Sequence, residues 1–108
     1  MSTIRISFII AMIGAVGVTF AESRPVLAAD ALNGKRLAER WCAACHVVSV
    51  TQREANADAP PFENIAKRPN FSELGLMTFL LDPHAKMPDM SLTRVEASDI
   101  AAYVGTLR

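Results

Sequence analysis

The sequence predicts a small all-α domain that follows an N-terminal export signal. Three observations support this fold class. No segment alternates apolar and polar residues for long enough to indicate a strand. Apolar residues recur at helical spacing in several segments, and a residue able to cap a helix precedes three of these segments. The chain has 108 residues, a length that suits one domain and excludes a multidomain enzyme.

The charge of the chain argues against a nucleic-acid partner. Eleven Lys and Arg residues balance eleven Asp and Glu residues, so the formal net charge is zero. A protein without excess positive charge lacks a long-range attraction to phosphate backbones. We therefore expect no binding to nucleic acid.

Residues 1–29 have the composition of a cleavable secretory signal peptide. Arg5 is the only charge among the first 21 residues, and residues 6–20 form an uncharged, mostly apolar run. As a helix, this run would extend about 22 Å. A hydrocarbon core is about 30 Å thick, so the run favours cleavage, with a retained anchor as the alternative. Small residues place the cut after Ala21, Ala28 or Ala29. The mature domain, residues 30–108, is then expected in the periplasm and not embedded in a membrane.

A domain of this size needs more than its own core for stability. One hydrophobic core in so short a chain supplies only about 3–5 kcal/mol, and such domains usually add a disulfide, a metal or a cofactor. Cys42 and Cys45 are the only cysteines, and a disulfide between them would close a very short loop and constrain the chain little. The sequence therefore indicates a bound group on which folding depends.

The first predicted helix covers residues 31–43. Asp30 can accept hydrogen bonds from the first backbone N–H groups of this helix. Charged residues occupy one side, which indicates a solvent-facing surface. The apolar stripe expected to face the core consists of Leu32, Leu37, Ala38 and Trp41.

Two further helices are predicted in the middle of the chain. Residues 62–67 can form one or two turns before Pro69 stops them. Ser72 can cap the next helix, which must end near Leu81 because Pro83 forbids its continuation. The expected apolar stripe of this helix contains Leu74, Met77, Leu80 and Leu81, and Met77 is interpreted as a core residue.

The last predicted helix has the clearest signals. Residues 93–96 (T-R-V-E) form a capping box, in which the first and fourth side chains each bond the other's backbone. Apolar residues then follow at positions i, i+3, i+4 and i+7, namely Ile100, Tyr103, Val104 and Leu107. The segments at residues 47–61 and 84–92 have no such period, so they are predicted loops.

Residues 42–46 (C-A-A-C-H) form the pattern C-x-x-C-H, which attaches haem c. Two cysteines at this spacing can bond to the two vinyl groups on one edge of a porphyrin, and His46 then offers a ring nitrogen to the iron. The motif predicts one covalent haem c held by Cys42, Cys45 and His46. A redox dithiol, which would need a neighbouring βαβ unit, and a zinc site, which would need a fourth ligand, are the alternatives.

Met87 is the predicted second axial ligand of the iron. It lies in a non-helical segment that Pro88 stiffens, so a loop can present its thioether. Met90 and His84 are the alternatives. A histidine and a methionine together leave no open coordination site, so the iron would cycle between Fe(II) and Fe(III) without binding substrate. The predicted function is electron transfer, and no enzymatic activity is expected.

Residues 30–108 resemble the class I, single-haem cytochromes c of bacteria. Gly34 stands eight positions before Cys42, where this family has a glycine that lets the first and last helices approach closely. The pair Met87-Pro88 is similar to the family's methionine loop. Pro60 looks like the family's proline whose carbonyl holds the ring N–H of the axial histidine, with Pro61 as the alternative.

This resemblance implies a small cytochrome c-like fold, with three main helices, a short one and loops wrapped around one haem. It implies a carrier that shuttles electrons in a respiratory chain between redox proteins such as a dehydrogenase, an oxidase or a reductase. The alternative is the haem subunit of a dehydrogenase complex or a small gas- or peroxide-binding haem protein. One departure is Ala38, where better-known members have an aromatic residue, and Trp41 and Tyr103 are expected to fill the core there. Arg68 is a candidate partner for a haem propionate.

Overall fold

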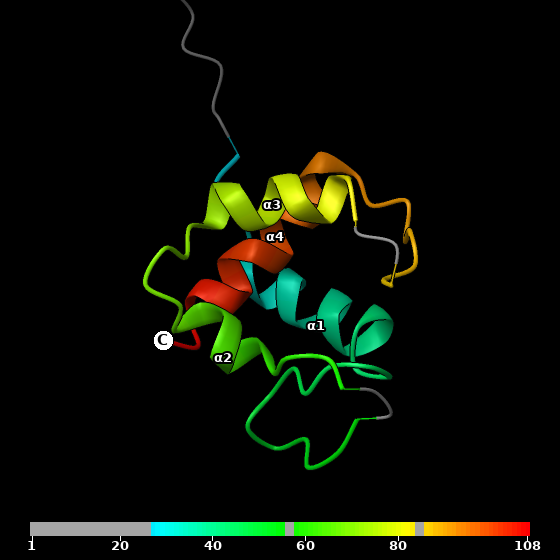
Figure 1. Cartoon of the computed structure of the whole chain (residues 1–108). Helices are drawn as coiled ribbons and strands as arrows, with labels where there is room; N and C mark the ends of the chain where they lie inside the picture. The colour runs from blue at the N-terminus through cyan, green and yellow to red at the C-terminus, as the bar shows by residue number, and fades with distance from the viewer. Residues whose placement is uncertain (1–26, 56–57, 84–85) are drawn as a thin grey trace, which may run out of the picture.

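Within residues 27–55, 58–83 and 86–108, which a computed structural model of the chain describes, there are four helices and no strand (Figure 1). They are α1 (Ala31–Trp41), α2 (Phe62–Ala66), α3 (Glu73–Leu81) and α4 (Arg94–Gly105). The predicted all-α class, with three main helices and a short one, is confirmed. Most of the predicted signal peptide and His84 lie outside the described residues. No helix in the described part is long and apolar enough to cross a membrane.

Side-chain caps set the start of the three main helices, as the sequence predicts. The Asp30 carboxylate accepts hydrogen bonds from the backbone N–H groups of Leu32 and Asn33, at 2.9 and 3.0 Å. Ser72 caps α3 in the same way, and both bonds of the predicted capping box are present at the start of α4. The end of α1 differs from the prediction by two residues, because the chain turns at Cys42, whose carbonyl accepts from the N–H groups of Cys45 and His46.

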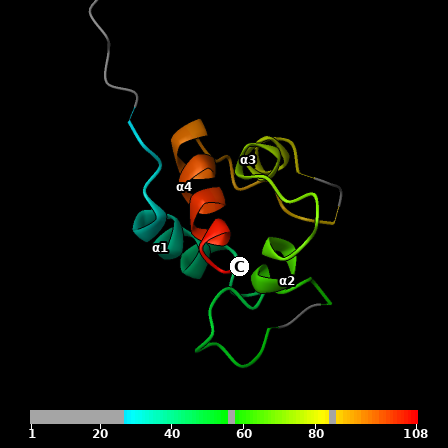
Figure 2. The ribbon, with the colours of Figure 1, turned by 90° about the vertical axis from the view of Figure 1, so that its left-hand side faces the viewer.

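The helix α4 lies between α1 and α3 (Figures 1 and 2), and its backbone approaches α1 closely at Gly34. A Cβ atom at Gly34 would lie 1.9 Å from the backbone oxygen of Asp99, so this crossing admits only glycine. The expected role of Gly34 is confirmed. Ala38, one turn later, is fully buried, because backbones this close leave no room for a larger side chain.

A buried carboxylate joins the start of α1 to α4. Asp99 is 4 % exposed, and its two oxygens accept from the backbone N–H of Asp30 at 2.7 Å and from the side-chain amide of Asn33 at 2.8 Å. A buried carboxylate is costly unless both oxygens are bonded, and here both are. These bonds fix the direction in which the chain enters α1.

The predicted apolar stripe of α1 is partly wrong. Leu32 and Trp41 are 72 % and 43 % exposed, whereas Gly34 and Ala38 are buried. The physical reason is the close crossing with α4, which selects the small residues of α1 for the buried side. Trp41 therefore does not pack in the core, and its ring instead lies beside the Arg40 guanidinium, whose central carbon is 4.8 Å from the ring centroid.

The stripe predicted for α3 is also partly wrong. Leu80 is buried and Met77 is half-buried against the core, as expected, but Leu74 and Leu81 are exposed. Six of the nine residues of this helix are large and apolar, and they lie on all sides of it, so periodicity alone does not identify the face that meets α4. The prediction for α4 is confirmed, since Ile100, Tyr103 and Val104 are buried and Leu107 is half-buried. The buried core also contains Val48 from the loop after α1 and Phe62 and Ala66 from α2.

Candidate haem site

A cavity of about 490 Å³ lies among the turn after α1, the helices α2, α3 and α4, and the described part of the loop before α4. Cavities that hold small molecules or cofactors span about 300–1,000 Å³, so this one has a suitable size. Most of its lining is apolar and includes Phe62, Ile65, Leu76, Leu80, Ile100 and Val104. Such a lining can bury the faces of a large apolar ring.

The His46 ring lies at this cavity and is held from behind. Its Nδ1 atom is 2.7 Å from the carbonyl oxygen of Pro60, and its ring meets that of Phe62 with a centroid distance of 5.3 Å. A carbonyl can only accept, so Nδ1 carries the hydrogen and Nε2 keeps its lone pair for a metal. The carbonyl of Pro60, and not that of Pro61, thus makes the contact expected for the axial histidine.

The two cysteines differ in their surroundings. Cys42 caps the end of α1, is buried and lines the cavity, whereas Cys45 is exposed and is not among the lining residues. Burial, with a smaller contribution from the nearby Cys45 thiol, raises the pKa of the Cys42 thiol to about 11. Before any bond forms to a cofactor, Cys42 is therefore a neutral thiol at ordinary pH.

Met87 lines the same cavity as Cys42 and His46, although 41 residues separate it from the histidine. Met87 is half-buried and packs against the core. Met90 is half-buried too but is not among the lining residues. The structure thus brings together three of the four predicted haem-binding residues at one cavity.

The residues present fit a haem. A thiol, an imidazole nitrogen and a thioether are the groups that attach haem c and ligate its iron, and all three occur at the cavity. The polar part of the lining includes Arg68, Asn70 and Ser72, whose donors suit carboxylates such as the propionates of haem. Size, apolar lining and donor set agree with one another.

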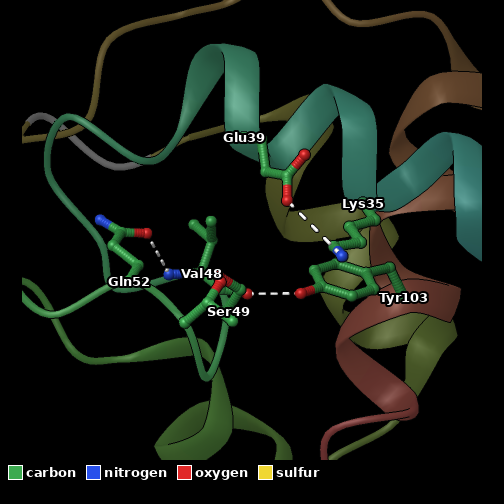
Figure 3. A network of polar contacts seen from close by, with 7 residues as sticks. Lys35, Glu39, Val48, Ser49, Gln52 and Tyr103 are labelled. Carbon is green, nitrogen blue, oxygen red and sulfur yellow. Dashed lines mark hydrogen bonds and ion pairs between the residues drawn. The ribbon is translucent and has the colours of Figure 1, made fainter.

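Sequence reasoning missed one residue near the site, Gln52. Its side chain bonds the backbone on both sides of His46, at Ala43 and Val48. A single glutamine in a polar loop gives no pattern that distinguishes it from its neighbours, so no sequence signal would have identified it. Tyr103 was predicted as a core residue, which is confirmed, but its hydroxyl also donates to the Val48 carbonyl at 2.6 Å (Figure 3).

A helical domain closed around a cavity with these donors is the architecture of a protein that carries haem c. The chain belongs to the cytochrome c family, which it matches over residues 31–108. It is 57 % identical over 88 residues to cytochrome c-552 of Bradyrhizobium diazoefficiens (strain JCM 10833 / BCRC 13528 / IAM 13628 / NBRC 14792 / USDA 110). That alignment covers 82 % of this chain and 85 % of the relative. No solved structure matches the chain. Membership of the family makes it a haem c electron carrier with covalently bound haem.

Proposed function

We propose that Cys42 and Cys45 form the two thioether bonds to the haem and that His46 and Met87 are its axial ligands. The observation that carries this proposal is the shared cavity, which His46 and Met87 line together with Cys42. When bound, the haem iron supplies one-electron chemistry by cycling between Fe(II) and Fe(III). The rest of the function belongs to the side chains that hold it.

Each of these side chains has a separate task. The bond from His46 Nδ1 to the Pro60 carbonyl fixes the orientation of the ring and raises the basicity of Nε2. The soft thioether of Met87 favours Fe(II) and so raises the reduction potential. With His46 and Met87 both bound to the iron, no coordination site would remain for a substrate, so the protein would act as a carrier and not as an enzyme.

We also propose that the protein is exported to the periplasm and shuttles electrons between a donor and an acceptor protein of a respiratory chain. The apolar run at residues 6–20 supports export. Leu27, Ala28, Ala29 and Asp30 are all exposed, so two of the three predicted cleavage positions lie where a peptidase can reach the chain. The mass of the exported holoprotein tests this proposal, because it gives the cleavage position and reports one added haem. An unprocessed mass would contradict cleavage.

The ligand assignment is tested by Met87→Ala with Met90→Ala as the matched control. In this family, methionine ligation gives the oxidised protein a weak absorption band at the red end of the visible spectrum. We expect Met87→Ala to lose this band and Met90→Ala to keep it. The opposite result would assign the ligand to Met90, and persistence of the band in both variants would contradict methionine ligation by either.

Carbon monoxide separates the carrier from a gas- or peroxide-binding protein. With both axial positions filled, the reduced wild type binds carbon monoxide slowly at neutral pH, and Met87→Ala binds it rapidly. Rapid binding by the wild type would indicate an open iron site and would favour the alternative function.

A further inference from the structure

We propose that Gln52 is a positioning residue for the axial histidine, an inference that rests on the proposed role of His46 as an iron ligand. Gln52 is not among the residues that line the haem cavity, and its hydrogen bond to His46 is made to the backbone carbonyl and not to the ring. It acts through the backbone that carries this ring, by holding the chain before and after His46 in one arrangement.

The backbone that follows the histidine is held by three donors. The carbonyl of His46 accepts from Gln52 Nε2 at 2.9 Å, that of Val47 from the backbone N–H of Phe62 at 3.0 Å, and that of Val48 from the Tyr103 hydroxyl at 2.6 Å. The donors come from the loop itself, from α2 and from α4. Three consecutive carbonyls are thus fixed from three parts of the fold, and Gln52 holds the first of them.

Gln52 uses its whole side-chain amide for this purpose. Its Nε2 atom lies 2.9 Å from the carbonyl oxygens of Ala43, His46 and Glu54, so two N–H groups are shared among three acceptors. Its Oε1 atom accepts from the backbone N–H of Val48 at 2.9 Å (Figure 3). One side chain therefore connects the C-x-x-C-H turn, the histidine and the loop after it.

This brace affects the ring because, besides the Phe62 ring against which it packs, the His46 imidazole has two supports that fix its orientation. One is the bond from Nδ1 to Pro60, and the other is the position of its own backbone. Without Gln52, the carbonyl of His46 and the N–H of Val48 lose their partners, and the half-buried turn must shift to find water. A shifted backbone lengthens the Nδ1 contact, and a weaker contact makes Nε2 less basic. A less basic imidazole stabilises Fe(III) less, so the reduction potential rises.

The test compares Gln52→Met with Arg53→Met in the holoprotein. Methionine has nearly the length of glutamine but no comparable donor, and Arg53 is the exposed next residue, so the control makes the same replacement outside the brace. For Gln52→Met we expect the His46 Nδ1–H to exchange with solvent at least about tenfold faster, as seen by NMR. We also expect the ratio of reduced to oxidised protein at a fixed potential to rise by about threefold to tenfold, tenfold being 59 mV for one electron. Arg53→Met should leave both quantities at their wild-type values.

A purely structural role for Gln52 predicts a different result. The variant would then unfold at a lower temperature, while its His46 exchange rate and reduction potential stayed those of the wild type, and this result would overturn the inference. Should Gln52→Met not fold, Gln52→Glu serves instead, because it keeps the acceptor for Val48 and removes both donors. For Gln52→Glu the readout is the exchange rate alone, because the added negative charge itself lowers the reduction potential. Faster exchange is expected, and an unchanged exchange rate again overturns the inference.

The spectra also separate this inference from the proposed function. If His46 ligates the iron, its ring protons are strongly shifted in the NMR spectrum of the oxidised wild type. Absence of these shifted signals would overturn both the ligand assignment and the role of Gln52. Their presence, together with a Gln52→Met variant that matches the wild type, would overturn the role of Gln52 alone.

Discussion

Gly34→Ala tests whether the crossing of α1 and α4 is as close as the structure shows. The added Cβ would lie 1.9 Å from the Asp99 oxygen, 2.4 Å from the Asp99 carbonyl carbon and 2.9 Å from the Ile100 nitrogen. All three are backbone atoms, so no side chain can move aside. The Asp99 oxygen is about 1.5 Å short of an ordinary van der Waals contact, and the helices must separate by a comparable distance.

The expected loss of stability follows from that separation. A gap of about 0.5–1 Å already removes a quarter to a half of the contact energy between facing atoms. Overpacking in a core typically costs about 1–3 kcal/mol, and because only backbone meets the new atom we take the upper value. Alanine offsets about 1 kcal/mol of this because it favours the helix over glycine. The net loss is about 2 kcal/mol, which lowers the midpoint of unfolding by on the order of 10 °C.

Thermal unfolding of the holoprotein measures this loss, with Gly105→Ala as the matched control. There the added Cβ would lie 2.6 Å from the end of the flexible Glu73 side chain, which can move away at little cost. Gly105→Ala should therefore unfold within a few degrees of the wild type. If Gly34→Ala unfolded together with this control, the close crossing of the two helices would be refuted.

Three further predictions concern hydrogen bonds made by charged or titratable side chains. Asp99→Ala leaves the Asp30 N–H and the Asn33 amide without their partner and should cost about 1–3 kcal/mol in denaturant unfolding, and a loss near zero would contradict this. Burial, with a smaller effect of the Glu39 charge, raises the pKa of Tyr103. The neutral hydroxyl therefore contributes its full stabilisation below the pKa of about 10 that tyrosine has in the unfolded chain, and this stabilisation is lost as the pH rises through the pKa of Tyr103 in the folded protein. Tyr103→Phe should remove this alkaline dependence, which unfolding measured against pH detects. Hydrogen bonds with Thr93 lower the pKa of Glu96. The ionised carboxylate therefore stabilises the fold above the pKa of Glu96 in the unfolded chain, and this stabilisation is lost as the pH falls through its pKa in the folded protein. Glu96→Gln should flatten the dependence of stability on acid pH, and an unchanged dependence would argue against the capping box.

The sequence predicted most of the fold because its helix signals are local. Asp30, Ser72 and Thr93 bond to backbone groups within three residues, so their effect does not depend on the rest of the chain. Periodicity worked for the C-terminal half of α4, where Ile100, Tyr103 and Val104 are buried at the predicted spacing, although the same helix also buries Asp99. It failed at Leu32 and Trp41, because the burial of α1 depends on how closely another helix approaches, which no local pattern encodes.

The candidate site was predicted unevenly, for a related reason. Cys42, Cys45 and His46 are adjacent in sequence, so their spacing alone indicates their chemistry. Met87 required the additional signal of Pro88, and the structure does place it at the cavity. Gln52 had no signal, since its role arises only once the chain has folded back and brought the loop against the turn.

The helix α4 couples the stability of the domain to the geometry of the site. Its backbone meets Gly34 at Asp99, and its side chains Ile100 and Val104 line the cavity. Its Tyr103 hydroxyl donates to the Val48 carbonyl, two residues after His46. A rigid helix transmits a displacement along its length. Separation of α1 from α4 therefore shifts the Tyr103 hydroxyl relative to the loop that carries the histidine. For this reason, Gly34 and Ala38 influence the haem site as well as the core, although neither of them lines the cavity.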